Sequence, residues 1–166
     1  MKNEGSRRQT RFPRAGGILL GLGLGGFFDG IVLHQILQWH HIATSAGYPA
    51  DTLENLKLNT LLDGLFHASC YILTAAGLFV LWRSARKQHF EWSFYELIAT
   101  LLIGFGVFNL VEGIIDHHVF GLHHVNETVP RDQWIYWDIG FLLWGAAMLV
   151  AGIMMMRNRN TTELVR

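Results

Sequence analysis

The sequence lacks what several classes of protein need. Cys70 is the only cysteine, so neither an internal disulfide nor a cluster of thiolate metal ligands can form within the chain. Charge is also scarce, at 16% of the 166 residues, and the 13 basic residues balance the 13 acidic ones. Because a weakly charged, neutral chain offers no basic surface, we expect no nucleic-acid partner. Most of the remaining chain is apolar, with 51% hydrophobic residues.

The charges are distributed so that four long apolar stretches are left nearly free of them. These stretches are residues 16–39, 59–82, 95–115 and 133–156, and each holds only one or two acidic residues and no basic one. A helix of about 20 apolar residues crosses the roughly 30 Å hydrocarbon core of a bilayer. Four buried helices of this kind would leave a soluble fold almost no polar surface. We therefore predict an all-α integral membrane protein, a four-helix bundle in the lipid bilayer.

The basic residues predict which way the four spans run. Eleven of the 13 Lys and Arg residues precede the first span, follow the second or follow the fourth, and only Lys57 and Arg131 fall at the opposite ends of the spans. The positive-inside rule then places both termini in the cytoplasm. The expected organisation is a basic cytoplasmic tail at residues 1–14, one transmembrane domain at 15–157 and a second cytoplasmic tail at 158–166.

Two segments 83 residues apart match in register. FDGIVLHQILQWHHI at residues 28–42 aligns without a gap with VEGIIDHHVFGLHHV at residues 111–125. Leucines match readily by chance in apolar helices, but a carboxylate and three histidines do not. We infer two duplicated two-helix units, residues 15–83 and 95–157. Because each unit has an even number of spans, we expect a pseudo-two-fold axis along the membrane normal. The paired histidines are His34/His117, His40/His123 and His41/His124.

A rise of about 1.5 Å per residue, counted from the basic ends of the spans, predicts the depth of each polar residue. Two layers result in the outer half of the membrane. The deeper layer holds Asp29, His67 and Glu112, and the shallower layer holds His34, Asp63, His117 and Asp138. If the helices continue, His40, His41, His123 and His124 lie about 10 Å further out, at the mouth of the bundle. His41 would then be too far from His34 for the two to bind one ion.

The buried polar residues indicate a metal site. Each ionisable residue in hydrocarbon costs roughly 2.5–3.5 kcal/mol unless it is paired, neutralised or bound to metal. Imidazole and carboxylate ligands suit Zn, Fe, Mn or Cu(II). We predict a transition-metal site, dinuclear if each unit supplies half of it, whose ligands and supporting residues are His34, Asp63, His67, His117, Asp138, Asp29 and Glu112. A secondary site at the mouth is expected from His40, His41, His123, His124, Asp116 and His118.

The residues leave several functions open. A b-type haem with His34 and His117 as axial ligands would make the protein an electron carrier. A ladder of polar residues through half the membrane also fits a proton or metal-ion transporter. A membrane metallohydrolase would need an open coordination position and a bound water. The mouth histidines could instead lie among lipid headgroups. Whether the protein is an enzyme is therefore not decided by these residues.

The motifs DGIVLHQILQWHH, LLDGLFH and EGIIDHH, with a late WD, resemble those of a bacterial family of four-helix membrane proteins classed as a domain of unknown function. The resemblance covers nearly all of residues 15–157. Some members look to be fused to a domain like those that assemble caa3-type oxidases. The resemblance thus implies a bacterial inner (cytoplasmic) membrane, a redox or metal-delivery role, and a respiratory oxidase or its assembly machinery as partner. It supplies no activity, and homo-oligomer formation stays open.

Overall fold

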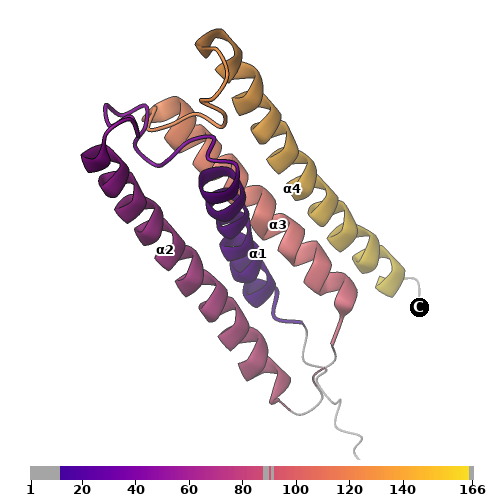
Figure 1. The fold of residues 1–166 in the computed structure, drawn as a ribbon. Coiled ribbons are helices and arrows are strands. Elements are labelled where there is room, and N and C mark those ends of the chain that lie inside the picture. Colours follow the sequence, from indigo (N-terminus) through magenta and orange to yellow (C-terminus); the bar gives the residue numbers. More distant parts are fainter. Residues whose placement is uncertain (1–11, 88–89, 91, 165–166) are drawn as a thin grey trace, which may run out of the picture.

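Four long helices make up the protein in the computed structural model, which describes residues 12–87, 90 and 92–164. They are α1 (Arg14–Phe28), α2 (Leu53–Ala85), α3 (Phe94–Glu112) and α4 (Trp134–Leu164). Successive helices run in opposite directions (Figure 1). Residues 1–11 of the predicted basic tail lie outside the described residues. At the other end, α4 continues through most of the predicted tail at 158–166.

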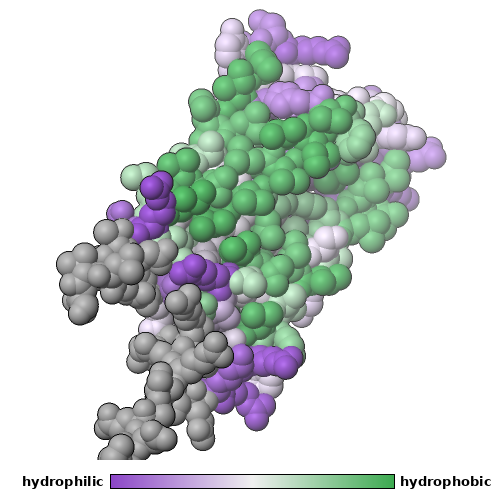
Figure 2. Space-filling model, turned by 180° about the vertical axis from the view of Figure 1, so that it is seen from behind, coloured by the Kyte–Doolittle hydropathy of each residue, from purple (hydrophilic) through white to green (hydrophobic). Residues whose placement is uncertain are grey.

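All four helices are long and apolar enough to cross a membrane. The candidate spans are Arg14–Ile36, Leu53–Ala85, Phe94–Val119 and Arg131–Asn158, of 23, 33, 26 and 28 residues. Apolar side chains form a broad belt between polar residues at the two ends of the molecule (Figure 2). Large side chains in this belt, such as Ile72 and Leu143, are exposed as lipid-facing residues are. The predicted all-α membrane fold with four spans is confirmed.

Helices α1 and α3 form the centre of the array. Helix α2 packs against α1 and α4 packs against α3, while α2 and α4 lie on opposite sides of the central pair (Figure 1). The backbones of α1 and α3 are in direct contact. A Cβ at Gly21 would clash with the carbonyl oxygen of Leu101, and a Cβ at Gly104 would clash with the carbonyl oxygen of Ile18. Small residues allow such close approach of membrane helices. The interior of the protein is therefore the seam between α1 and α3.

Both central helices end in a π-helix. Helix α1 passes into η1 (Asp29–Ile36) and α3 passes into η2 (Gly113–Val119). At their ends, the Leu37 N–H donates to the carbonyl of Val32, five residues back, at 2.8 Å. The Phe120 N–H makes the same bond to Ile115, also at 2.8 Å. A π-helix has wider turns than an α-helix and often marks a functional site.

The chain reverses directly after each π-helix. Gln38 and Gly121 have φ values of 51° and 58°, the left-handed conformation that commonly ends a helix. The expectation that the first span stays helical to Trp39 is wrong, because η1 ends at Ile36 and the following residues turn back. We call the end of the molecule that carries residues 37–52 and 120–130 the loop end. At this end the reversed segments return toward the seam between α1 and α3.

Buried polar residues on the outer helices hold these reversed segments in place. On α2, the fully buried Asn59 accepts from the Ala43 N–H at 3.0 Å and donates to the Tyr48 carbonyl at 2.7 Å. Asp63 accepts from the Ile42 N–H at 3.1 Å. On α4, Asp138 accepts from the Val125 N–H at 3.0 Å. Each loop is thus fastened to its neighbouring helix at a fixed height, which fixes the position of its histidines.

Candidate metal centre

The π-helices bring a carboxylate and a histidine together in each half of the chain. Residues five apart lie about 140° apart around an α-helix, so Asp29 and His34 would face different directions if the helix were regular. In η1 the Nε2 atom of His34 lies 3.1 Å from Oδ2 of Asp29. In the second half, Nε2 of His117 lies 3.0 Å from Oε1 of Glu112, again at a spacing of five residues. All four side chains are buried.

An aspartate on each outer helix holds the other side of these histidines. The Nδ1 atom of His34 donates to Oδ1 of Asp63 at 3.0 Å, and Nδ1 of His117 lies 3.7 Å from Oδ1 of Asp138. The second oxygen of each aspartate accepts from one more histidine, at 2.6 Å in both cases; these histidines are His41 and His124. The prediction that His41 lies about 10 Å beyond His34 is wrong, since the chain reverses between them.

His40 and His123 enter the seam rather than the mouth. Both are buried, and their rings stack with centroids 4.4 Å apart and planes inclined by 6°. The Nδ1 atom of His40 donates to the Val125 carbonyl at 2.9 Å, and Nδ1 of His123 donates to the Ile42 carbonyl at 3.3 Å. Each histidine is therefore oriented by a backbone carbonyl from the loop of the other half. The prediction of a separate mouth site is wrong for this pair.

Six side chains consequently meet in one cluster, which we call the central cluster: Asp29, His34, His40, Glu112, His117 and His123. The ring centroids of His34 and His40 are 4.2 Å apart, and those of His117 and His123 are 4.9 Å apart. The Nε2 atoms of His117 and His123 both lie 3.0 Å from Oε1 of Glu112. The cluster thus joins both halves of the chain across the seam.

Several buried atoms of this cluster have no aligned hydrogen bond to the residues that the structure describes. They are Oδ1 of Asp29, Oε2 of Glu112, Nε2 of His34 and His40, and both ring nitrogens of His117. Buried polar atoms in folded proteins nearly always have a partner, and a group of orphaned ones points to a water or ion among them. Here the orphaned atoms are imidazole nitrogens and carboxylate oxygens, which are metal ligands.

The hydrogen bonds of the imidazoles determine which ring nitrogen can bind an ion. Carboxylate and carbonyl oxygens only accept, so Nδ1 of His34 and Nδ1 of His40 carry a proton. His123 faces an acceptor through both nitrogens, the Ile42 carbonyl at Nδ1 and Glu112 at Nε2. For His40, burial lowers the pKa well below its usual range, and the nearby rings of His123 and His34 lower that pKa further. A neutral imidazole that donates through one nitrogen to a carboxylate or carbonyl binds metal through the other. His40 has this arrangement.

Among the residues that the structure describes, three sets of donor atoms lie close enough together to hold an ion, with all donors of a set within 4.8 Å of one another. Two sets belong to the central cluster: His34 with His40 and His123, and Glu112 with His117 and His123. The third set, His34 with His41 and Asp63, lies toward the loop end. Small side-chain shifts would bring each set to the 2.0–2.2 Å that metal–ligand bonds require.

Six predicted site residues belong to none of these sets. Asp29 faces His34, Asp138 faces His117, and His124 bonds to Asp138. The other three are His67, Asp116 and His118. The Nε2 atom of His67 faces Gly30, where a Cβ would clash with it, and the ring stacks on Phe27 at 6.2 Å. His67 therefore packs against the start of η1, although its spacing of four from Asp63 predicted a shared site. Asp116 is half-buried and His118 is exposed, both outside the three sets.

The return of His40 and His123 to the seam was not predicted, because a straight helix was expected through these residues. Gly121 was the available signal, since glycine commonly follows the end of a helix in the left-handed conformation. The alignment at an offset of 83 pairs Gly121 with Gln38, which adopts the same conformation without being glycine. The carbonyls of Ile42 and Val125, which orient the stacked histidines, belong to apolar residues and give no signal of their own.

The fold and the cluster define the class of this molecule: a four-helix membrane protein with a buried cluster of histidines and carboxylates between its central helices. Residues 16–159 match the family model described as "Predicted membrane protein (DUF2243)", and the chain belongs to this family. The family resemblance inferred from the histidine motifs is thereby confirmed. No curated protein and no solved structure matches the chain. The link to oxidase assembly and the bacterial origin stay predictions.

Proposed function

We propose that this protein binds transition-metal ions in the membrane, and that the central cluster is its metal centre. The observation that carries the proposal is the convergence of four buried imidazoles and two buried carboxylates. Nδ1 of His34, His40 and His123 is held by Asp63 and by two loop carbonyls, and Nδ1 of His117 faces Asp138 at 3.7 Å. Hydrogen bonds that orient buried imidazoles within one cluster support ligand binding there.

Electrostatics support the same conclusion. Asp29 and Glu112 are buried in a segment that crosses the membrane, where an uncompensated carboxylate is costly. The only partners that the structure gives them are the central histidines. A divalent cation between the two carboxylates would balance their charge and satisfy the orphaned oxygen of each. This arrangement also leaves the histidines neutral, as metal ligands must be.

The central donor sets describe two neighbouring positions for an ion, and we propose a dinuclear centre when both positions are filled. The two sets share His123 and otherwise use different residues. A neutral imidazole ligates one ion through one nitrogen, so with both positions filled His123 binds one ion and the remaining residues of the other set hold the second. Helical bundles build dinuclear centres from carboxylates and histidines on facing helices in a comparable way. The ligands are nitrogen and oxygen, which favours Zn, Fe, Mn or Cu(II) over Cu(I). The stacked rings of His40 and His123 occupy the space between His34 and His117, which supports metal ions over haem.

The family resemblance supports a redox or metal-delivery role near respiratory oxidases, while the cluster itself supports metal binding. X-ray absorption of protein purified without chelators tests the metal centre. We expect a first shell of nitrogen and oxygen with the scattering pattern of imidazole, lost on His40→Ala. His118→Ala, at an exposed histidine on the same π-helix as His117, serves as the control and should leave the spectrum unchanged.

A further inference from the structure

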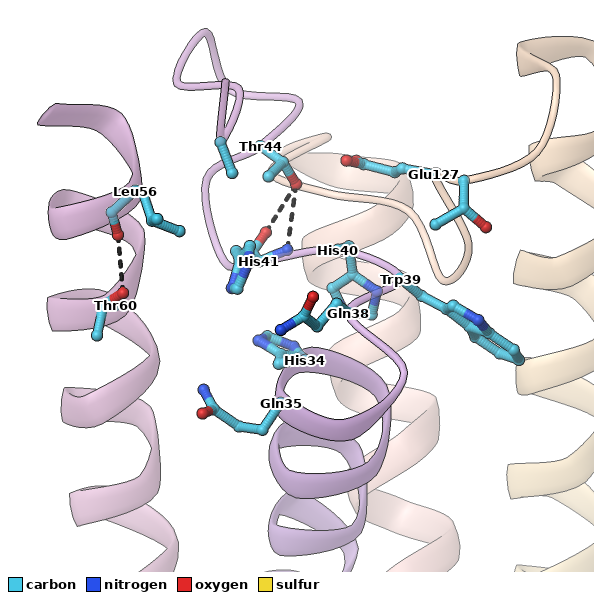
Figure 3. A pocket seen from close by; sticks show the side chains of 12 residues that line it. His34, Gln35, Gln38, Trp39, His40, His41, Thr44, Leu56, Thr60 and Glu127 are labelled. Atoms are coloured by element: carbon cyan, nitrogen blue, oxygen red, sulfur yellow. Dashed lines mark hydrogen bonds between the residues drawn. The ribbon is translucent and has the colours of Figure 1, made fainter. Parts of the chain in front are cut away.

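A cavity of about 530 Å³ lies beside the central cluster at the loop end. It is bounded by η1 with its returning loop, by α2 and by residues of the 120–130 loop, and its lining includes His34, His40 and His41 (Figure 3). Six waters around a metal ion occupy roughly 180 Å³ at about 30 Å³ each. A hydrated ion therefore fits the cavity with room to exchange its waters.

The chemistry of the lining suits a cation. Among the described residues that line the cavity there is an acidic side chain, Glu127, but no Lys or Arg. Gln35, Gln38, Thr44 and Thr60 add amide and hydroxyl oxygens, which can take the place of water around an ion (Figure 3). The lining thus offers carboxylate, amide and hydroxyl oxygens together with the imidazoles of His34, His40 and His41.

The third donor set lies where this cavity meets the central cluster. His34, His41 and Asp63 can hold one ion, and two of the three line the cavity. The Nδ1 atom of His34 faces Asp63, at 3.0 Å, while its Nε2 atom faces Asp29, at 3.1 Å. One imidazole therefore separates the third donor set from the central cluster. An ion in the third set would replace the proton on Nδ1 of His34, and that proton would move to Nε2, beside Asp29. Transfer to the central cluster would take the ion to the other side of that ring.

We infer that His34, His41 and Asp63 form a loading site, at which a hydrated divalent transition-metal ion from the cavity is first bound and from which it moves into the central cluster. The inference rests on the proposed function, because it needs the central cluster to be the destination. It adds a metal position outside the central cluster, a route and a direction of access, namely from the loop end.

The second half of the chain provides an internal control. His124 bonds to Asp138 at the same 2.6 Å as His41 bonds to Asp63, and the two histidine side chains are 24% and 15% exposed. His117 is further from its aspartate, however, at 3.7 Å, and the corresponding three residues do not form a donor set among the described residues. The His124→Ala variant therefore loses the same kind of bond to an aspartate as the His41→Ala variant, while the loading site keeps all three of its ligands.

Uptake of Co²⁺ by the metal-free protein, followed by its visible absorption in a stopped-flow instrument, tests the route. His41→Ala should slow uptake at least about tenfold, the order expected for loss of one ligand, and reach the same final Co²⁺ content. His124→Ala should load at the wild-type rate. Equal rates for His41→Ala, His124→Ala and wild type, or equal slowing of both variants, overturn the loading site. If wild-type protein takes up no Co²⁺, the proposed function fails and the loading site with it.

A second pair of variants tests the cavity without changing any ligand. Thr60 and Ser69 are exposed on α2, and each hydroxyl donates to the carbonyl four residues before it. Only Thr60 lines the cavity of the loading site. Thr60→Trp should fill part of the cavity and slow Co²⁺ uptake, whereas Ser69→Trp should not. If both variants load at the wild-type rate, the ion does not enter through this cavity.

A variant that lacks the central ligation allows ion binding at the loading site to be measured by itself. His123 belongs to both central donor sets and not to the third, so His123→Ala removes the central ligation and leaves the loading site complete. This variant should retain one weakly bound Co²⁺ ion. Adding His41→Ala should abolish that ion, and adding His124→Ala should leave it in place. Retention of the ion in the double variant with His41→Ala contradicts the inference.

Discussion

His40 and His123 are 83 residues apart in the chain, yet their rings stack at 4.4 Å and each is oriented by a carbonyl from the loop that carries the other. The metal centre proposed here therefore cannot assemble from one half of the chain. This interdependence distinguishes it from two separate sites that merely resemble each other, and it explains why both loops turn back into the seam between α1 and α3.

Matching contacts in the two halves lead to a prediction about symmetry. The bonds that end the π-helices, the left-handed residues after them and the crossed carbonyl bonds all recur at an offset of 83. In an experimental structure, residues 16–83 should superpose on 95–157 by rotation about the membrane normal. This rotation should bring His34 onto His117 and Asp63 onto Asp138. A best superposition that inverts the membrane topology would contradict the duplication.

The aspartates that orient the histidines should control metal affinity. Asp63→Asn keeps the size of the side chain but weakens its bonds to His34 and His41. Asp138→Asn likewise weakens the bond to His124 and the attraction to His117, 3.7 Å away. Loss of such a supporting partner typically lowers metal affinity 10- to 100-fold, and we expect about this loss in a Zn²⁺ competition titration. Asp132→Asn changes an exposed aspartate and is the control. Unchanged affinity in both site variants would show that Asp63 and Asp138 do not support the ligands.

The close approach of α1 and α3 should be sensitive to a single methyl group. A Cβ at Gly104 would meet the Ile18 carbonyl and the backbone of Leu22, neither of which can yield as a side chain could. Gly104→Ala should therefore lower the free energy of unfolding in detergent by about 1–3 kcal/mol, as overpacking does. Gly64→Ala adds its methyl group to open space and should cause no loss. Equal stability of the two variants would show that the seam tolerates separation.

Membrane orientation is a further prediction, made from the basic residues. In a Cys70→Ala background, a cysteine at the exposed position Ser45 should react with an impermeant reagent applied to intact cells. A cysteine at Arg86, at the other end of α2, should react only after the membrane is ruptured. The reverse pattern would place the loop end in the cytoplasm, and the termini outside.

Much of the arrangement could be predicted because it depends on helix length and periodicity. The spans follow from their apolar composition, and the shared height of His34 and Asp63 follows from counting residues along two antiparallel helices. The repeat also predicts that His117 and Asp138 lie at the same depth in the membrane. These relationships need only the rise per residue of a regular helix, which the sequence determines well.

The entry of His40 and His123 into the cluster could not be predicted, because it depends on where the regular helix stops. A π-helix places Asp29 beside His34, and no residue type marks it in advance. Gln38 adopts a left-handed conformation without being glycine, so the reversal that returns His40 to the seam was not apparent from that half alone. His67 was assigned to the site by its depth, which says nothing of its packing against Gly30.

The metal content of the purified protein tests the central claim most directly. Wild-type protein, prepared without chelators and analysed for all transition metals together, should carry one to two ions per chain. His123→Ala removes a donor from both central sets and should reduce that content to the single weakly held ion of the loading site or to none after dialysis. Wild-type protein that carries no stoichiometric transition metal and binds none when metal is added would contradict the claim, and the buried histidines and carboxylates would then be better explained as a path for protons.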